Sequence, residues 1–194
     1  MNTFEKTLFK QYKLLMNLEQ KKRHDFLDMP KGSIQKKIIK GNVYYYLQYR
    51  DSDKIKSRYI KIEDVPLMEL NIAKRNELHS ELRNIEKQKK DIEHIISKDD
   101  LIIGVIELSV QKVAKKHPEI TLIKLFGSRA DGTYTDASDV DLIFETKGAV
   151  SLMKQSEIRL EFEKELGLEV DLIHGPVPDD SFLDIKKEII LYAA

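Results

Sequence analysis

Residues 125–132 read LFGSRADG, and residues 138–142 read SDVDL. The first stretch begins as an apolar strand and breaks at Gly127, and the second returns as a strand that carries Asp139 and Asp141. Side chains two residues apart on a strand point to the same face, so we expect these two carboxylates to converge. Adjacent carboxylates repel each other unless a cation lies between them. Because only oxygen ligands are on offer, the stretch predicts a site for Mg²⁺ or Mn²⁺.

A third aspartate follows in the apolar run 168–173, where Asp171 lies between two residues that point to the opposite face. A strand beside residues 140–144 would bring Asp171 next to the aspartate pair. Three carboxylates can hold two metal ions, which clamp a nucleoside triphosphate and an attacking hydroxyl for in-line displacement. In that arrangement Asp171 helps to position or deprotonate the hydroxyl.

The Gly-Ser turn predicts a phosphate-binding element next to these acids. Gly127 permits a backbone turn that most residues avoid and lets a ligand approach closely. Ser128 lies where a short helix begins, so its hydroxyl and the free N–H groups would face a phosphate. An acid at Asp131 weakens the positive field there. Arg129 either compensates by contacting a phosphate or pairs only with Asp131 or Asp136.

Charge is unevenly distributed along the 194 residues. The chain has 33 basic and 33 acidic residues, but residues 129–194 contain 7 basic and 15 acidic ones, a net charge of −8, so the rest carries +8. An acidic half behind a basic half indicates two different tasks. There is no cysteine, the N-terminus lacks the apolar segment of a signal peptide, and no apolar run approaches the roughly 20 residues of a membrane span. We expect a soluble cytoplasmic protein that does not contact a membrane.

The basic half begins with a predicted amphipathic helix over residues 4–28. A three-stranded meander over about 33–39, 43–50 and 54–62 follows, separated by turn residues. Its strands interleave tyrosines with Lys36, Lys37, Lys40, Arg50, Lys54, Lys56, Arg58 and Lys61. Such a surface suits a nucleic-acid backbone and unstacked bases. Alternatively, the tyrosines only pack on a neighbouring element and the lysines lie in water.

A long helix is predicted over residues 67–97, with a coiled-coil-like apolar stripe at Leu78, Leu82, Ile85, Ile92 and Ile96. This stripe pairs either with the helix of residues 4–28, as an antiparallel hairpin, or with a second copy of the chain in a homodimer. Ser97 indicates a helix N-cap. We therefore expect an N-terminal domain over residues 1–98, for binding a partner or nucleic acid, and a catalytic domain over residues 99–194.

The second domain alternates between helices and strands. Helices are expected over 100–116, 152–166 and 180–191, and strands over 120–126, 140–144 and 168–173. His174 ends the last strand, where a structural or exposed role is more common than a catalytic one. The fold class is α+β or α/β: a short mixed sheet with flanking helices, preceded by a helical hairpin that carries the meander.

The order of these motifs resembles the signature of the polymerase-beta-like nucleotidyltransferase superfamily, closest to the minimal nucleotidyltransferases. The resemblance extends over about residues 100–194, and residues 189–192 resemble the end of the family's C-terminal helix. It implies that Gly127 and Ser128 bind the triphosphate, that Asp139 and Asp141 bind both metals, and that Asp171 binds the catalytic metal.

The resemblance implies transfer of a nucleoside monophosphate, AMP from ATP above all, to a hydroxyl of a protein, an aminoglycoside-like small molecule or an RNA end. Minimal nucleotidyltransferases often act as antitoxins that modify a partner toxin. The short catalytic unit, without the C-terminal helical domain of drug-modifying relatives, favours a protein acceptor. The competing hypotheses are a nucleic-acid-binding module and a partner-binding module, each with a non-catalytic nucleotidyltransferase-like domain.

Overall fold

The computed structural model describes residues 2–178 and 185–194. The chain divides into two compact units: Met1–Leu14 with Asp91–Ala194, here called the C-terminal unit, and Leu15–Lys90, here called the hairpin unit. The sequence-based boundary at residue 98 groups all earlier residues together, whereas residues 1–14 and 91–98 belong with the later ones. None of the described helices combines the length and the apolar character that crossing a membrane requires.

The helices of the hairpin unit are α1 (Thr3–Asp28), from Leu15 onward, and α2 (Val65–Glu93), as far as Lys90. Leu78 and Ile85 of the predicted stripe are buried within the chain. Their burial agrees with pairing of the two helices within one chain, the first of the two alternatives. Lys89, which occupies the position missing from the stripe, pairs with Glu19 at 2.8 Å. Burial alone would raise the pKa of Glu19, but hydrogen bonds from Lys89 and Arg23 outweigh it and lower that pKa. The polar position therefore becomes a cross-helix ion pair.

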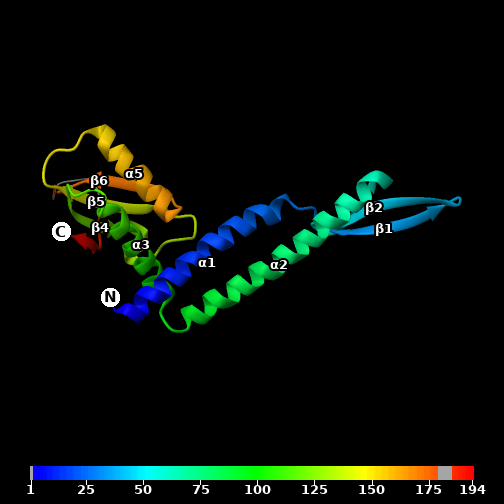
Figure 1. Ribbon diagram of the computed structural model, residues 1–194, viewed down its shortest axis with the longest axis horizontal. Helices are drawn as coiled ribbons and strands as arrows, with labels where there is room; N and C mark the ends of the chain where they lie inside the picture. Colours follow the sequence, from blue (N-terminus) through cyan, green and yellow to red (C-terminus); the bar gives the residue numbers. More distant parts are fainter. Residues whose placement is uncertain (1, 179–184) are drawn as a thin grey trace. The chain divides into compact units, whose positions relative to one another are not determined.

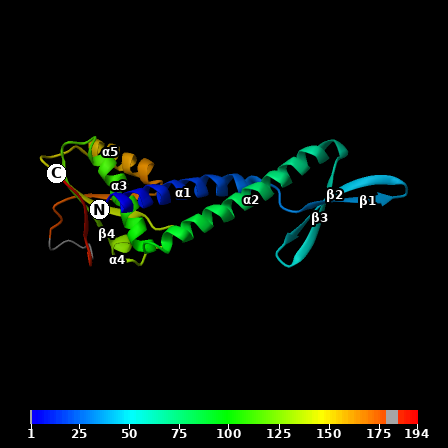
Figure 2. The ribbon, with the colours of Figure 1, turned by 60° about the horizontal axis from the view of Figure 1, so that its bottom comes forward.

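The predicted meander is confirmed as the antiparallel sheet β1 (Ser33–Ile39), β2 (Asn42–Asp51) and β3 (Lys54–Ile60), which is labelled in Figure 2. The short helix η1 (Ile62–Asp64) leads from β3 into α2, and one face of the sheet packs on the start of α2 around a core of Leu47, Ile60 and Val65. Tyr45 and Tyr49 pack against this core. The alternation of β2 thus buries one set of tyrosines and leaves the other set on the opposite face.

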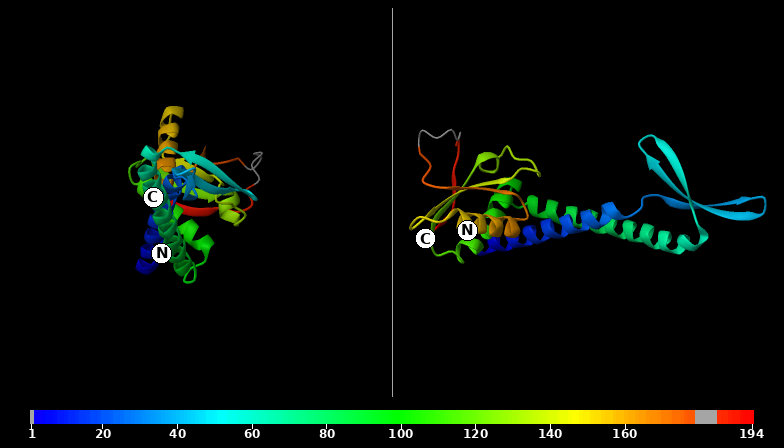
Figure 3. Two further views of the ribbon diagram at one scale, coloured as in Figure 1. Left: turned by 90° about the vertical axis from the view of Figure 1, so that its right-hand side faces the viewer. Right: turned by 90° about the horizontal axis from the view of Figure 1, so that it is seen from above.

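The C-terminal unit is a four-stranded mixed sheet in the order β6-β5-β4-β7 with helices on one side (Figures 1 and 3). Its elements along the chain are α3 (Lys98–Ala114), β4 (Ile120–Phe126), α4 (Gly127–Asp131), β5 (Val140–Thr146), α5 (Leu152–Leu166), β6 (Val170–His174) and β7 (Ile189–Ala193). The expected N-cap is confirmed, since the Ser97 hydroxyl accepts a hydrogen bond from the Asp100 N–H. α5 ends at Gly167, whose φ of 71° is left-handed, as expected for a C-cap.

The sheet has one largely apolar face and one mixed face, which carries the predicted acids, because side chains alternate along its strands. Val140, Leu142 and Phe144 of β5 are fully buried, and so are Ile123 of β4 and Ile158 of α5. Asp141, Ile143 and Glu145 occupy the alternate positions of β5 and therefore point to the opposite face. The polar side chains of the predicted site consequently project from the face that α3 and α5 do not cover.

The first turns of α1 belong to the C-terminal unit because their side chains pack there. Phe9 is buried and lies against α3 at Gly104, where an added Cβ would come within 2.3 Å of the Phe9 ring. The Tyr12 hydroxyl donates to Glu93 at 2.5 Å. Lys13 donates to the Ser109 hydroxyl and to Glu165. These contacts place an N-terminal helix segment against the helical layer of the sheet.

The expected helix over residues 180–191 is wrong where it can be compared. Residues 185–188 are not helical, and residues 189–193 form β7, while 180–184 lie outside the described residues. The interpretation of residues 189–192 as the end of a helix is wrong for the same reason. β7 pairs antiparallel with β4, and its Leu191 is buried. A short apolar run with two isoleucines suits a strand, and it satisfies the edge of β4 that a helix would leave unpaired.

Candidate functional site

Three aspartates converge at one end of strands β5 and β6. Asp139 precedes β5, Asp141 is its second residue, and Asp171 is the second residue of β6. The two strands run parallel, and Asp141 lies directly opposite Asp171 in their register. The carboxylate oxygens of the three residues lie within 4.8 Å of one another. The juxtaposition expected from the sequence is therefore present in the fold.

The ionised form of the Asp141 carboxyl is destabilised by its surroundings. Burial raises the pKa of Asp141, repulsion by Asp139 and Asp171 raises it further, and Arg129 only partly opposes these effects. Three convergent carboxylate oxygens form the donor set that Mg²⁺ and Mn²⁺ prefer. A divalent cation would remove the repulsion, so the residues present fit a metal of this kind.

The turn between β4 and α4 is shaped around Asp141. Gly127 has a φ of 67°, a left-handed conformation that favours glycine. A Cβ added at this position would come within 2.2 Å of Asp141 Oδ2, far closer than two such atoms approach. Gly127 thus serves two purposes: it allows the turn, and it leaves room for a carboxylate. Ser128 follows at the second position of α4 and is partly exposed.

Arg129 has partners that the sequence did not indicate. Its side chain is 3% exposed, and it donates from Nε to the carbonyl oxygen of Asp139 at 2.8 Å and from Nη2 to that of Ser138. Its guanidinium carbon lies 5.2 Å from the ring centre of Tyr134. Burial lowers the pKa of Arg129, against the effect of nearby tyrosine and aspartate groups. Arg129 therefore fixes the backbone that carries the first aspartate of the pair.

Asp131 has a local structural role. Its Oδ1 accepts hydrogen bonds from the Thr133 hydroxyl at 2.7 Å and from the Thr133 N–H at 3.2 Å. These bonds lower the pKa of Asp131. The next residue, Gly132, is left-handed and closes α4. The acid thus caps the turn after α4, which accounts for an acidic residue close to the predicted phosphate turn.

The loop between α4 and β5 is held by two residues of α3, Lys98 and Asp99, which the sequence did not indicate as part of the site. The Tyr134 hydroxyl donates to Asp99 at 2.9 Å, and Lys98 lies 3.6 Å from Asp136. Burial and the hydrogen bond to Asp99 raise the pKa of Tyr134 to about 12. The only sequence signal was the acidic first turn of α3, which also fits simple helix capping.

His174 lies three residues beyond Asp171 on β6, opposite Phe144. Its ring packs edge-on against Phe144, and its Nε2 lies 3.0 Å from the Thr146 hydroxyl. The structure thus gives His174 contacts at the far end of the strand pair.

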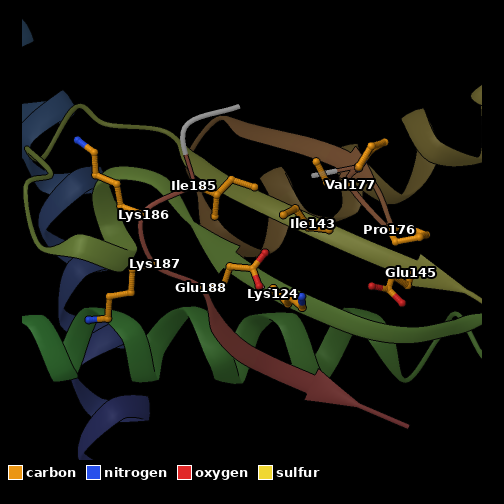
Figure 4. A pocket seen from close by; sticks show the side chains of 10 residues that line it. Lys124, Ile143, Glu145, Pro176, Val177, Ile185, Lys186, Lys187 and Glu188 are labelled. Carbon is orange, nitrogen blue, oxygen red and sulfur yellow. Dashed lines mark hydrogen bonds and ion pairs between the residues drawn. The ribbon is translucent and has the colours of Figure 1, made fainter. Parts of the chain in front are cut away.

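Two recesses lie in the surface of the C-terminal unit, and one of them is lined by members of the acidic cluster. A groove of about 480 Å³ is lined by Asp139, Asp171, Arg159, Glu163 and residues 167–170. A second pocket, of about 460 Å³, lies farther along the mixed face of the sheet. Figure 4 shows Ile143 and Glu145 of β5 and Lys124 of β4 facing the segment that carries Ile185 to Glu188. The carboxylates are accordingly reached from an open surface.

Two family models match the sequence. Residues 109–192 match the family "Polymerase beta, Nucleotidyltransferase", and residues 7–70 match a domain of unknown function, DUF6788. The first match spans β4 to β7 and includes all three aspartates. The second spans α1, the meander and the start of α2. No curated protein matches the chain.

Several solved structures resemble part of the chain. A toxin–antitoxin complex with AMP-PNP is 22% identical, with a TM-score of 0.39 over 45% of this chain and 73% of that one. A complex of the tri-AMPylated Shewanella oneidensis HEPN toxin with MNT antitoxin is 18% identical, with a TM-score of 0.36 over 47% and 73%. A nucleotidyltransferase-like protein of Sulfolobus solfataricus is 21% identical, with a TM-score of 0.38 over 50% and 86%.

Proposed function

We propose that the polymerase-beta-type nucleotidyltransferase domain formed by residues 109–192 transfers AMP from ATP to a hydroxyl group of a partner protein. One observation carries the proposal: the carboxylates of Asp139, Asp141 and Asp171 converge within 4.8 Å. They lie beside the Gly127 turn, which leaves space around Asp141. An acidic cluster next to a glycine turn is suited to a metal-bound triphosphate.

Asp139, Asp141 and Asp171 would hold the divalent ions, Mg²⁺ or Mn²⁺. When bound, such ions neutralise phosphate charge and polarise the phosphoryl group under attack. The chain contributes a rigid placement of the three carboxylates, since two of them come from paired strands and the third is fixed through its backbone by Arg129. Preorganised groups of this kind need no rearrangement during the reaction.

In the proposed reaction, the acceptor oxygen forms a bond to the α-phosphorus of ATP. The bond from that phosphorus to the bridging oxygen of the β-phosphate breaks, and pyrophosphate leaves. The acceptor hydroxyl also loses its proton. Asp171 is exposed and lines the surface groove, and we assign it the task of orienting the incoming hydroxyl and accepting its proton.

The triphosphate would lie along the turn that contains Gly127 and Ser128. Gly127 offers no side chain to obstruct the phosphates, and the Ser128 hydroxyl is partly exposed next to it. We assign Arg129 a positioning role instead of the nucleotide contact expected from the sequence. The support is that its guanidinium is buried and already donates to two backbone carbonyls.

A protein acceptor is favoured by the open character of the site. Asp171 and Asp139 line a surface groove. A protruding side-chain hydroxyl can enter such a groove, whereas a small molecule usually needs a concave pocket that covers most of its surface. The solved complexes named above contain a toxin, which makes a protein encoded beside this chain the first acceptor to test. An aminoglycoside-like compound and an RNA end remain the acceptors for the control reactions.

The test is transfer of radioactive label in the presence of Mg²⁺ and the product of the adjacent gene. Label at the α-phosphate of ATP should enter the partner, and label at the γ-phosphate should not. Asp139→Asn and Asp171→Asn should each abolish transfer, while Asp131→Asn, an exposed acid in the same region, should leave it intact. Transfer from the γ-phosphate would indicate a kinase. Equal transfer by wild type and Asp139→Asn, or no transfer to protein, small molecule or RNA, would refute the proposal.

A further inference from the structure

The meander of the hairpin unit has a second face that the core does not use. Its core consists of Leu47, Ile60 and Val65, with Tyr45 and Tyr49 packed against it. The alternate residues of the strands point the other way. They include three tyrosines and two basic residues, which we name the tyrosine face: Lys37, Tyr44, Tyr46, Arg50 and Tyr59.

The tyrosines of this face form one cluster. Tyr46 lies directly opposite Tyr59 in the pairing of β2 with β3, with ring centres 5.8 Å apart in an edge-on arrangement. The Tyr44 ring centre is 6.4 Å from that of Tyr59. Tyr59 is 55% exposed. The three rings thus pack against one another on a face without residues of the meander's core cluster, and Tyr59 leaves much of its surface open to a ligand.

Positive charge surrounds the cluster. Lys37 Nζ lies 5.0 Å from the ring centre of Tyr46, and Arg50 is an exposed residue farther along the same face of β2. Residues 33–61 contain eight lysines and arginines but only two acids, Asp51 and Asp53. The meander therefore combines aromatic rings at its centre with an excess of cationic side chains around them.

We propose that the tyrosine face binds single-stranded nucleic acid. Exposed aromatic rings on a sheet stack with unpaired bases, and surrounding cations contact the phosphates. A duplex keeps its bases stacked inside the helix, so it would use the charges but not the rings. An acidic peptide would likewise use only the charges. Among these three ligands, only the single strand uses both the rings and the charges.

The structure also separates the cations of the meander by the face on which they lie. Lys54, Lys56 and Arg58 alternate onto the face that packs on the core, because Lys56 lies opposite Tyr49 and Arg58 lies opposite Leu47. Lys36 and Lys37 are neighbours on β1 and are both exposed, but they point to opposite faces: Lys36 lies opposite Tyr45 and Lys37 opposite Tyr44. They offer a matched pair of exposed lysines with equal charge on different faces of the sheet.

The test measures binding of fluorescein-labelled 12-nucleotide RNA and DNA single strands to the full chain by fluorescence anisotropy. A duplex of the same length and polyglutamate are the comparison ligands. Single strands should bind more tightly than either, and their affinity should fall steeply between about 50 and 200 mM salt. RNA and DNA strands reveal whether the ribose hydroxyl contributes.

The variants separate stacking from charge. Tyr46→Ala and Tyr59→Ala should each weaken single-strand binding roughly 5- to 150-fold, whereas Tyr46→Phe and Tyr59→Phe, which keep the ring, should bind like wild type. Lys37→Glu should weaken binding clearly more than Lys36→Glu. Circular dichroism of each variant checks the fold, and the phenylalanine and lysine variants retain the core if an alanine variant unfolds.

Four results would overturn the proposal: no binding of any single strand at about 50 mM salt, equal binding of duplex and single strand, equal effects of Lys37→Glu and Lys36→Glu, or tighter binding of polyglutamate. The last result would point to an acidic protein partner. None of these outcomes depends on nucleotide transfer by the C-terminal unit.

Discussion

Asp141 is the residue at which the proposed chemistry and the stability of the fold conflict. Its carboxyl is half-buried between two other acids, and its pKa is raised in the folded protein by burial and then by repulsion from Asp139 and Asp171. A carboxyl whose folded pKa lies above its unfolded value destabilises the fold once it ionises. This cost is absent below the ordinary pKa of 3.8 and grows as pH rises through the folded value.

Asp141→Asn should therefore stabilise the metal-free protein at pH 7, by about 1 kcal/mol if one repulsion at about 4 Å is relieved and water screens it fully. The gain should vanish below about pH 3.8, and saturating Mg²⁺ should reverse it by stabilising only the wild type. Urea unfolding at several pH values measures this. Asp131→Asn is the matched control with the opposite sign, because hydrogen bonds lower the pKa of Asp131. An Asp141→Asn protein less stable than wild type at pH 7 without metal would contradict the account.

Gly127 tests whether the turn is built for the carboxylate. In Gly127→Ala, the left-handed backbone should cost about 1–2 kcal/mol of unfolding free energy, and the new Cβ must displace Asp141 Oδ2, 2.2 Å away. Nucleotide transfer should fall at least about 100-fold, as expected for a misplaced reacting group. Gly132 has a similar φ of 85°, but the nearest atom to its Cβ is 3.7 Å away.

Gly132→Ala should accordingly show the backbone cost and retain most of the transfer activity. Denaturant unfolding and the label-transfer assay on both variants give the comparison. Equal loss of activity in the two proteins would mean that backbone strain alone, and not the space around Asp141, explains the glycine.

Arg129→Lys distinguishes a positioning residue from a nucleotide contact. Lysine keeps the charge but cannot donate in a fork to the carbonyls of Ser138 and Asp139. We expect an unfolding free energy lower by about 1.5–3 kcal/mol, weaker Mn²⁺ binding, a reduced kcat and an unchanged KM for ATP. A raised KM with unaltered stability would instead assign Arg129 to the triphosphate.

At the scale of elements, the docking of the first turns of α1 on α3 depends on a glycine. Gly104→Ala would gain about 1 kcal/mol of helix propensity, but its Cβ would come within 2.3 Å of the Phe9 ring. Overpacking of this kind costs about 1–3 kcal/mol, so we expect a net loss of stability. Adding Phe9→Leu should recover part of it, and Gly148→Ala, with no neighbour within 4 Å, should be neutral.

Thermal unfolding of the single and double variants measures this coupling. A Gly104→Ala protein more stable than wild type would mean that Phe9 does not pack against Gly104. So would a double variant that loses more unfolding free energy than the two single variants lose together.

Periodicity predicted most elements, and its failures have physical causes. The helix of residues 152–166 carried a clear stop signal in Gly167, and the meander carried turn residues between its strands. The run Ile189–Tyr192 has no partner visible in sequence, since only the unpaired edge of β4 decides that it becomes a strand. The docking of α1 on α3 depends in the same way on a contact between Phe9 and Gly104, about 95 residues apart in sequence.

The acidic site was predictable because the spacing of its aspartates along the sequence shows that their side chains share one face of the sheet. Asp139 and Asp141 lie two residues apart at the start of β5, and Asp171 is the second residue of β6, so the parallel pairing of the two strands brings them together. Arg129 was not predictable in the same way. Its partners are backbone carbonyls of Ser138 and Asp139, which no pattern of side chains reveals, and charge alone indicated phosphate or acidic partners.

At the scale of the whole molecule, the two units present different chemistry. The C-terminal unit contains the acidic cluster on a mixed sheet, and the hairpin unit contains the basic, tyrosine-rich meander. The opposite charges of the two halves of the sequence thus correspond to two separate surfaces. We propose that the three carboxylates of the C-terminal unit form a single site for a divalent cation and a nucleoside triphosphate.

The most direct measurement is calorimetric titration of Mn²⁺ into the full chain in the presence of a non-hydrolysable ATP analogue. Wild type should bind Mn²⁺. Each of the variants Asp139→Asn, Asp141→Asn and Asp171→Asn should bind it at least about tenfold more weakly, since changing even a group that only supports a metal ligand costs about that much affinity. Asp131→Asn, which removes the same charge from a nearby exposed position, should bind like wild type. Wild-type affinity in the three cluster variants, or an equal loss in Asp131→Asn, would contradict the claim that these carboxylates form one metal site.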